Sequence, residues 1–546
     1  MRRCRSWSVL CLCGLALLTG TGCKHGGAAS KDIWVASARE AIERAATDAR
    51  REKDSKSAAV ALAEAASAMA KIDRESALRL FGESLRRASR LSNRPGPNGR
   101  AYALENIGIL MAAVDRERAA QVLETAIHLS ERAPSSSRDL IYGPRVPELV
   151  SALARVDPRA ALQATGRIRD SASRVVVVGE IALALAKTNP ATAGSTVDKA
   201  WAGFREIRSV DERKELQAEF LARLAEVLPD KASPLLATVA GRTYRDTVLL
   251  GLVKGTAGRS KQRALRYANM IEDPVIASAA FRQLAHSDVD RGARYLDDAV
   301  SKIKGAAAQT DLRDPVGFTS EVAFLVLDLA GRSERGEALQ LLNVAAGQVR
   351  RRQLTMHERT RMLILLSGAA SQVDATRALT LLTGAIGSRR AAALDDVGID
   401  LHAIAPYLAA LGPALGDYCV RVAGEDLRPA LLGLMALEVA GSRPAVGRGW
   451  LGQAQVLYVR RPGKQGPGER VDPFYRHDFT LSLLAYAQGA LLDQPSRALQ
   501  TAASISQPWW RAMTYARLAE VFLDRPRAKA KMTPDQALNS LVAALR

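Results

Sequence analysis

Apolar residues recur at intervals of three and four along most of the chain and rarely alternate at an interval of two. The first spacing marks one face of an α-helix, whereas the second would mark a strand. The segment DRERAAQVLETAI (115–127) is typical, with small or apolar residues at Ala119, Leu123, Ala126 and Ile127. Gly and Pro are scattered between such segments, which predicts short turns. We therefore predict an all-α fold.

A short motif returns along the first part of the chain: an Asp or Asn is followed four residues later by an Ala. Its copies start at Asp73, Asp115, Asp157 and Asn189, in steps of 42, 42 and 32 residues. Asp and Asn cap helix N-termini because their side chains accept bonds from free backbone N–H groups. Pro158 and Pro190 then occupy the first helical position, where the missing N–H costs nothing. The motif predicts the corner of a helical hairpin.

The Ala of each copy lies one turn into the second helix, where a small side chain lets that helix approach its partner. These residues are Ala77, Ala119, Ala161 and Ala193. Later copies start at Glu334, at Asp374 and, more loosely, at Gln494. A period of about 20–50 residues that builds one hairpin per copy is typical of a solenoid.

Two segments, DRERAAQVLETAI (115–127) and DATRALTLLTGAI (374–386), resemble the second helix of a tetratricopeptide repeat. The Trp, Leu-Gly and Tyr pattern of that family's first helix is missing and the period varies, so HEAT-type hairpins are the alternative resemblance. Either resemblance implies an α-solenoid, a superhelix of tandem helical hairpins. Stacked hairpins offer a long concave face suited to a peptide or helix of a partner.

The N-terminus has the features of a bacterial secretory signal. Three arginines precede an apolar run from Val9 to Leu18, and small residues lead to Cys23. The stretch TGTGC resembles a lipobox with Gly20 in place of the usual Leu, which implies lipidation of Cys23. We therefore expect a signal peptide over 1–22 and a tether over 23–33. The expected location is the bacterial envelope, lipid-anchored and facing the periplasm. Lys24 after the cysteine resembles the enterobacterial sorting pattern, which implies the outer membrane; a chain that is not lipidated would be secreted.

Beyond the tether we expect a repeat array over 34–440, an irregular insert over 441–479 and C-terminal helical repeats or a cap over 480–546. The insert carries seven basic residues against three acidic ones and is rich in aromatics. Its segment AQVLYVRR could form a short strand. Because loops on rigid scaffolds often bind partners, the insert is the predicted contact surface; a self-packed surface loop is the alternative. The candidate contact residues are Trp450, Tyr458, Arg460, Arg461, Lys464, Arg470, Phe474, Tyr475 and Arg476.

The chain has a formal net charge of +20, from 77 Lys and Arg against 57 Asp and Glu. This balance favours anionic partners such as lipid or glycan. The two signs are largely intermixed along the helices, which favours solvated helix faces over a dedicated anion-binding surface. Cys419 would be the one thiol left beyond Cys23, and we expect it to be a core residue.

The sequence carries no phosphate-binding, nucleotide-binding or serine-hydrolase motif. In MHERTRM, Arg361 stands where a zinc site needs its second His. The acidic group Asp395, Asp396, Asp400 with His402 could form a cation or acid–base site, but Asp also gathers at helix starts, where it caps the helix and complements its dipole. The neighbours His477 and Asp478 could be a catalytic pair, but adjacent side chains diverge on most backbones. We predict no catalytic residue, no metal and no cofactor.

These features favour a non-enzymatic, lipid-anchored envelope scaffold that binds a partner protein of unknown identity through a helical repeat surface. An α/α-superhelical enzyme or a binder of envelope glycan or anionic polymer is the alternative. Nucleic acid is not expected as a partner, because no recognition module is visible.

Overall fold

The computed structural model describes residues 28–93, 99–131, 146–186, 188–309, 314–386, 400–425, 427–459, 473–492, 494–524 and 532–545, without the side chains of 28–31 and 473–476. These residues form 27 α-helices, a few short 3-10 turns and no strand. The predicted all-α fold is confirmed, and the helices pack largely in sequential pairs, consistent with a superhelical arrangement within each part of the chain.

Two compact units divide the chain. Unit 1 comprises Met1–Glu52, Glu64–Ala77 and Leu312–Arg546, and unit 2 comprises Lys53–Ala63 and Leu78–Asp311. The residues of α3 (Ser55–Ala70) and α4 (Arg74–Ala88) are divided between them.

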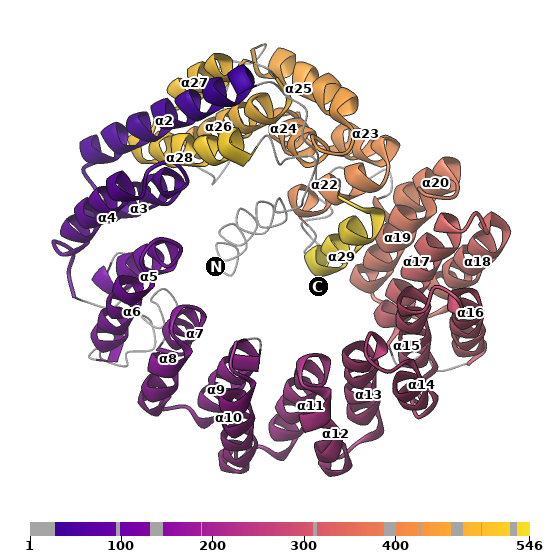
Figure 1. Ribbon diagram of the computed structural model, residues 1–546. Coiled ribbons are helices and arrows are strands. Elements are labelled where there is room, and N and C mark those ends of the chain that lie inside the picture. The colour runs from indigo at the N-terminus through magenta and orange to yellow at the C-terminus, as the bar shows by residue number, and fades with distance from the viewer. Residues whose placement is uncertain are drawn as a thin grey trace. The chain divides into compact units, whose positions relative to one another are not determined.

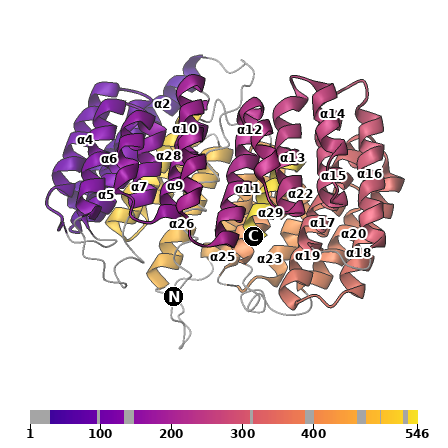
Figure 2. The same ribbon diagram turned by 90° about the horizontal axis from the view of Figure 1, so that it is seen from below.

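Unit 2 continues with six helical pairs. They are α5 (Arg100–Met111) with α6 (Arg116–Glu131), α7 (Val146–Val156) with α8 (Pro158–Ala164), α9 (Ser171–Ala186) with α10 (Pro190–Gly203), α11 (Val210–Val227) with α12 (Pro229–Leu235), α13 (Arg242–Ala257) with α14 (Lys261–Asn269), and α15 (Pro274–Ser287) with α16 (Gly292–Ala308). The first helices of the pairs form one row and the second helices another (Figure 1). Figure 2 shows them side by side with roughly parallel axes.

Unit 1 repeats this arrangement. Its elements are α2 (Ala28–Arg51), α17 (Pro315–Gly331) with α18 (Arg335–Arg351), α19 (Met356–Ala370) with α20 (Ala375–Ile386), α22 (Leu401–Leu411) with α23 (Pro413–Val422), α24 (Arg428–Glu438) with α25 (Pro444–Val459), α26 (Pro473–Leu491) with α27 (Pro495–Ala503), α28 (Pro508–Asp524) and α29 (Pro534–Leu545).

The predicted hairpin corners are confirmed at atomic detail. The Asp157 side chain caps α8 by accepting bonds from the backbone N–H groups of Arg159 and Ala160, at 2.9 and 3.1 Å. Asn189 caps α10 through the N–H of Thr192 at 3.2 Å. Asp73, Asp115 and Asp374 accept the equivalent bonds at their helices. The four motif alanines are fully buried, as the close approach of the two helices requires.

A second repeated feature links each pair to the next and was not predicted. An aliphatic residue lies three positions before the first residue of the following first helix. Its backbone N–H donates a hydrogen bond to the carbonyl oxygen three residues earlier. The examples are Ile168, Ile207, Val239, Ile271 and Ile505, of which all but the half-buried Val239 are buried. Each therefore anchors a turn between consecutive pairs.

Glycines permit one unusually close helix contact. A Cβ atom at Gly251 or Gly255 of α13 would overlap the backbone carbonyl oxygens of Ala222 or Ala225 on α11. The two glycines are one turn apart and so lie on one face of α13. The backbones of α11 and α13 meet there without side chains between them.

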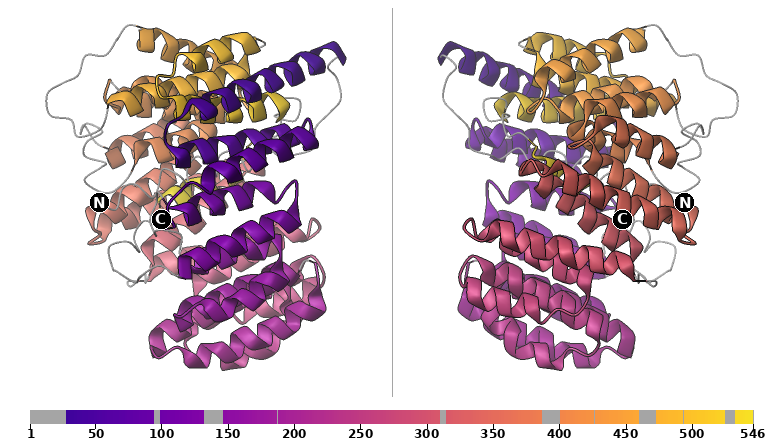
Figure 3. Two further views of the ribbon diagram at one scale, coloured as in Figure 1. Left: turned by 90° about the vertical axis from the view of Figure 1, so that its left-hand side faces the viewer. Right: turned by 90° about the vertical axis from the view of Figure 1, so that its right-hand side faces the viewer.

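In unit 1, α2 packs on α28, from the opposite end of the chain (Figure 3). The Arg511 guanidinium donates to both carboxylate oxygens of Asp48, at 2.8 and 3.0 Å. The rings of Trp34 and Phe522 lie 5.5 Å apart between centroids. The helix α29 packs across α17, α19 and α22, so both ends of the described chain are held by helices distant in sequence.

The predicted irregular insert over 441–479 is wrong for most of its described residues. The structure has helix α25 over Pro444–Val459, and α26 already begins at Pro473. The short strand expected in AQVLYVRR is helical as far as Val459. Trp450 and Leu451 of α25 are buried, so packing selects the helix in spite of the local Gly content. Residues 460–472 lie outside the described part.

Candidate partner-binding groove

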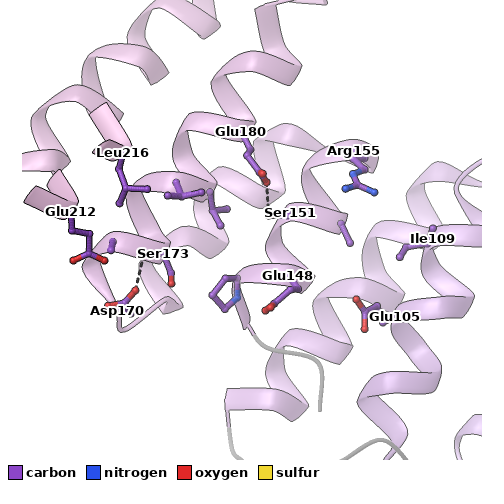
Figure 4. A pocket seen from close by; sticks show the side chains of 15 residues that line it. Glu105, Ile109, Glu148, Ser151, Arg155, Asp170, Ser173, Glu180, Glu212 and Leu216 are labelled. Carbon is purple, nitrogen blue, oxygen red and sulfur yellow. Dashed lines mark hydrogen bonds between the residues drawn. The ribbon is translucent and has the colours of Figure 1, made fainter. Parts of the chain in front are cut away.

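A pocket of about 600 Å³ lies on the row of first helices in unit 2 (Figure 4). Its residues come from α5, α7, α9 and α11 and from the turn before α9. Several of them are one helical turn apart, as in the pairs Glu105 with Ile109 and Glu212 with Leu216. Residues at this spacing project from the same face of a helix. Each of the four first helices, α5, α7, α9 and α11, therefore presents one face to the groove.

Part of the groove is apolar. Ile109 on α5 is 43% exposed and Val176 on α9 is 37% exposed, and Leu216 on α11 is half-buried. The cores of α5 and α9 are served by other residues, for example the buried Ile107 and Val177. Ile109 and Val176 therefore add exposed aliphatic surface to a hollow that the fold does not fill. Exposed apolar side chains in a hollow, with polar groups beside them, are typical of binding sites.

Carboxylates lie between and beside these apolar residues along the groove (Figure 4). The groove is lined by Glu105, Glu148, Asp170, Glu180 and Glu212, with Arg155 as the one cationic side chain among its lining residues. The local charge is thus negative although the chain as a whole carries +20. A concave surface lined by one sign of charge attracts ligands of the opposite sign, here cations.

Two of these carboxyl groups have distinct electrostatic environments. Burial, and after it the neighbouring Glu148 carboxylate, raises the pKa of Glu105 to about 7. The hydrogen bonds from the Ser173 side chain and backbone lower the pKa of Asp170, whose carboxylate accepts from the Ser173 N–H at 2.7 Å and caps α9. The groove therefore holds a permanent anion at Asp170 and a protonatable group at Glu105.

One hydrogen bond crosses the groove wall. Ser151 on α7 donates its hydroxyl to Glu180 on α9 at 2.8 Å (Figure 4). The bond fixes one Glu180 oxygen, so the carboxylate stays at the wall of the groove between α7 and α9. It fixes the position of this charge with respect to Val176, one turn away on α9.

The structure does not support Trp450 as a contact residue. Its side chain is 3% exposed, and its Nε1 donates to Asp417 at 2.8 Å. Trp450 is a core residue because α25 packs its apolar face on α24. Tyr458 is half-buried at the end of α25, with its hydroxyl 2.8 Å from His477 Nε2, and burial raises its pKa to about 12.

The structure does not describe the side chains of the remaining predicted contact residues or of the predicted anchor residue. Phe474, Tyr475 and Arg476 lie in α26, but their side chains are not described. Cys23, Arg460, Arg461, Lys464 and Arg470 lie outside the described residues.

The acid–base candidates that the structure describes have structural roles. His477 contacts Tyr458, whereas Asp478 is fully buried and accepts from the Ser506 and Gln507 N–H groups at the start of α28, at 2.9 and 3.0 Å. The two neighbours therefore point to different elements. Asp400 caps α22 through the His402 N–H at 2.9 Å. Asp395 and Asp396 lie outside the described residues.

Cys419 is buried, as expected for a core residue. Burial raises the pKa of its thiol to about 12, so it is no nucleophile at neutral pH. Across the ranges given above for the structure, no three His, Cys, Asp or Glu side chains gather as a metal site would need. Among the helices described there, none combines the length and the apolar character that a bilayer span requires.

The groove was not predicted from the sequence, because the repeated Asp and Ala motif lies in the second helices and the groove lies on the first helices. A signal was present in the first helices: a carboxylate and an aliphatic residue one turn apart, as in Glu105 with Ile109, Val176 with Glu180 and Glu212 with Leu216. Such pairs are common on helices, and only the side-by-side packing of α5, α7, α9 and α11 gives them a shared surface.

Comparisons with known proteins assign no family to this chain. No protein-family model matches its sequence, and no curated protein matches it either. The molecule is an all-helical protein of many packed helical pairs, consistent with a helical repeat.

Proposed function

We propose that this protein is a non-enzymatic adaptor that binds a partner protein in the groove of α5, α7, α9 and α11. The observation that carries the proposal is the pair of exposed aliphatic side chains, Ile109 and Val176, in a hollow of about 600 Å³ that is also lined by carboxylates. Protein interfaces combine apolar contacts with polar and charged groups in this way. The negative lining opposes anionic lipid or glycan, which would have to bind another face.

The finer features of the proposal come from the sequence. The hairpins resemble tetratricopeptide repeats in their second helices, and the lipobox-like TGTGC at 19–23 supports a lipid anchor at Cys23. Together they favour an adaptor tethered in the bacterial envelope, on the outer membrane and facing the periplasm. This location makes an envelope protein the expected partner.

The proposal is tested by photo-crosslinking in the native cells. A photoreactive benzoylphenylalanine replaces Val176 in the groove in one strain and Val289 in another. Val289 is a matched control because it is also an exposed valine of unit 2, at 94% exposure, and does not line the groove. After irradiation, covalent adducts are purified and identified by mass spectrometry.

We expect a discrete protein adduct from position 176 and not from position 289. Adducts of the same proteins at both positions, or no protein adduct at position 176, would refute binding in the groove. Processing at Cys23 is read separately, from the mass of the N-terminal peptide of the mature chain.

A second candidate function is hydrolysis of envelope glycan in the same groove, favoured by the pairing of Glu105 with Glu148. A carboxyl group with a raised pKa beside an ionised carboxylate is the usual acid and base pair of glycosidases. The groove lining includes no aromatic side chain on which a sugar ring could stack, so we rank this function second. Release of soluble fragments from isolated envelope glycan, abolished by Glu105→Gln, would establish it and displace the adaptor proposal.

A further inference from the structure

We infer that the occupant of the groove is an amphipathic helix of the partner, with an apolar stripe flanked by Lys and Arg. The inference rests on the proposed function and adds the chemistry of the bound segment. Its three supports are an internal precedent in unit 1, the exposed aliphatic side chains of the groove and the negative charge of its lining.

The precedent is α29, which lies on the first helices α17, α19 and α22 within unit 1. This helix of 12 residues buries a single stripe, formed by Ala537, Leu538, Leu541 and Leu545. A Cβ atom at Gly368 of α19 would lie 3.2 Å from Leu541, so α29 sits directly on that row. The row of first helices in this chain is therefore a surface on which a helix packs.

In unit 2 the corresponding row, α5, α7, α9 and α11, carries the groove and no such helix among the described residues. Ile109 and Val176 of this row line the groove, and both remain exposed. A helix that crosses this row would bury them with residues spaced three and four apart, as α29 does with Leu538 and Leu541.

The charged side chains of the groove indicate that the expected occupant differs from α29 in the residues that flank its apolar stripe. The α29 stripe is flanked by uncharged residues and Asp535, whereas the groove presents five carboxylates against Arg155. A helix with Lys or Arg on both sides of its stripe would place cations over Glu148, Glu180 and Glu212. An acidic helix would be repelled by the same groups.

The test is the binding of designed peptides to the purified full-length chain, followed by fluorescence anisotropy. The first peptide has about fourteen residues, with Leu at helical three-and-four spacing and Lys elsewhere, a length close to that of α29. The second has every Lys replaced by Glu. The third keeps the Lys and Leu content but has two central prolines, which prevent a helix. The protein variants are Val176→Lys in the groove, which removes apolar surface and adds a cation that repels the peptide, and Val289→Lys as the matched control, with helicity checked by circular dichroism.

We expect the Lys/Leu peptide to bind at least about tenfold more tightly than either of the other two. Val176→Lys should weaken its binding by about tenfold or more, and Val289→Lys by less than about twofold. Equal binding of the Glu and Lys peptides, equal binding of the proline peptide, or equal effects of the two valine variants would overturn the inference. Protein adducts at position 176 in cells combined with any of these results would leave the adaptor function standing and remove only the basic helix.

Discussion

At the scale of single residues, buried carboxylates cap turns that are distant in sequence, a role that their sequence neighbours do not reveal. Asp478 on α26 and Asp246 on α13 each cap the turn that leads into the next first helix, Asp246 through the N–H groups of Glu272 and Asp273 at 3.3 and 2.8 Å. Asp246 is 2% exposed and Asp478 is fully buried. Buried carboxylates are retained in these positions because backbone N–H groups satisfy them.

Glu105 has no such donor among the residues that the structure describes, and its raised pKa leads to a prediction about pH. Its pKa is about 7 in the fold against an ordinary 4.5, so the folded protein binds this proton more tightly than the unfolded chain. The stability due to this group is present below about pH 4.5 and is lost as the pH rises through about 7. We expect Glu105→Gln to be more stable than the wild type at about pH 8 and nearly equal to it at about pH 4.5.

The measurement is the urea midpoint of both proteins at the two pH values. Glu212→Gln is the control, because Glu212 lines the same groove but is exposed. An advantage of Glu105→Gln that is the same at both pH values would show that this carboxyl group is not the one that titrates.

At the scale of elements, the pairing of helices depends on small residues at their contacts. Ala161 and Ala193 are fully buried at the hairpin corners, and Gly251 and Gly255 let α13 touch the α11 backbone. The anchor residues Ile168 and Ile207 then set where one pair ends and the next begins. These contacts place α9, α11 and α13 side by side and so shape the row that carries the groove.

We expect Gly255→Ala to lower the free energy of unfolding by about 1–3 kcal/mol, since its new Cβ would overlap the Ala225 carbonyl oxygen and force α13 away from α11. The matched control is Gly305→Ala on α16, where no atom lies within 4 Å of the added Cβ. This control should gain about 0.5–1 kcal/mol, the usual helix preference of Ala over Gly. Urea denaturation of both variants measures these changes in the free energy of unfolding. A higher free energy of unfolding for Gly255→Ala would show that α11 and α13 are not in close contact.

At the scale of the whole chain, the N-terminal helix α2 belongs to unit 1 together with the C-terminal helices. The ion pair between Asp48 and Arg511 joins residues 463 positions apart, and its side chains are 9% and 22% exposed. Arg511 also donates to the Ile505 carbonyl oxygen at 2.7 Å. Sequence-distant contacts of this kind tie the first described helix into unit 1.

We expect Asp48→Ala to cost about 2–3 kcal/mol of stability, because it leaves a largely buried guanidinium without its carboxylate. In a double-mutant cycle with Arg511→Ala, the coupling energy should exceed about 1 kcal/mol. Denaturant unfolding of the four proteins gives this number. Strictly additive effects would mean that α2 is not held on α28 by this pair.

The sequence by itself determined what depends on neighbouring residues: helix type, the hairpin corners and the caps at Asp157 and Asn189. Helix periodicity and capping bonds act within a few residues, so they can be read along the chain. Only the tertiary structure decided which helices lie side by side, and hence the burial of Trp450, the helix over 444–459 and the α2–α28 contact. The groove belongs to this second class. Its carboxylates and aliphatic residues are visible in the sequence, but they form one surface only because four first helices pack in a row.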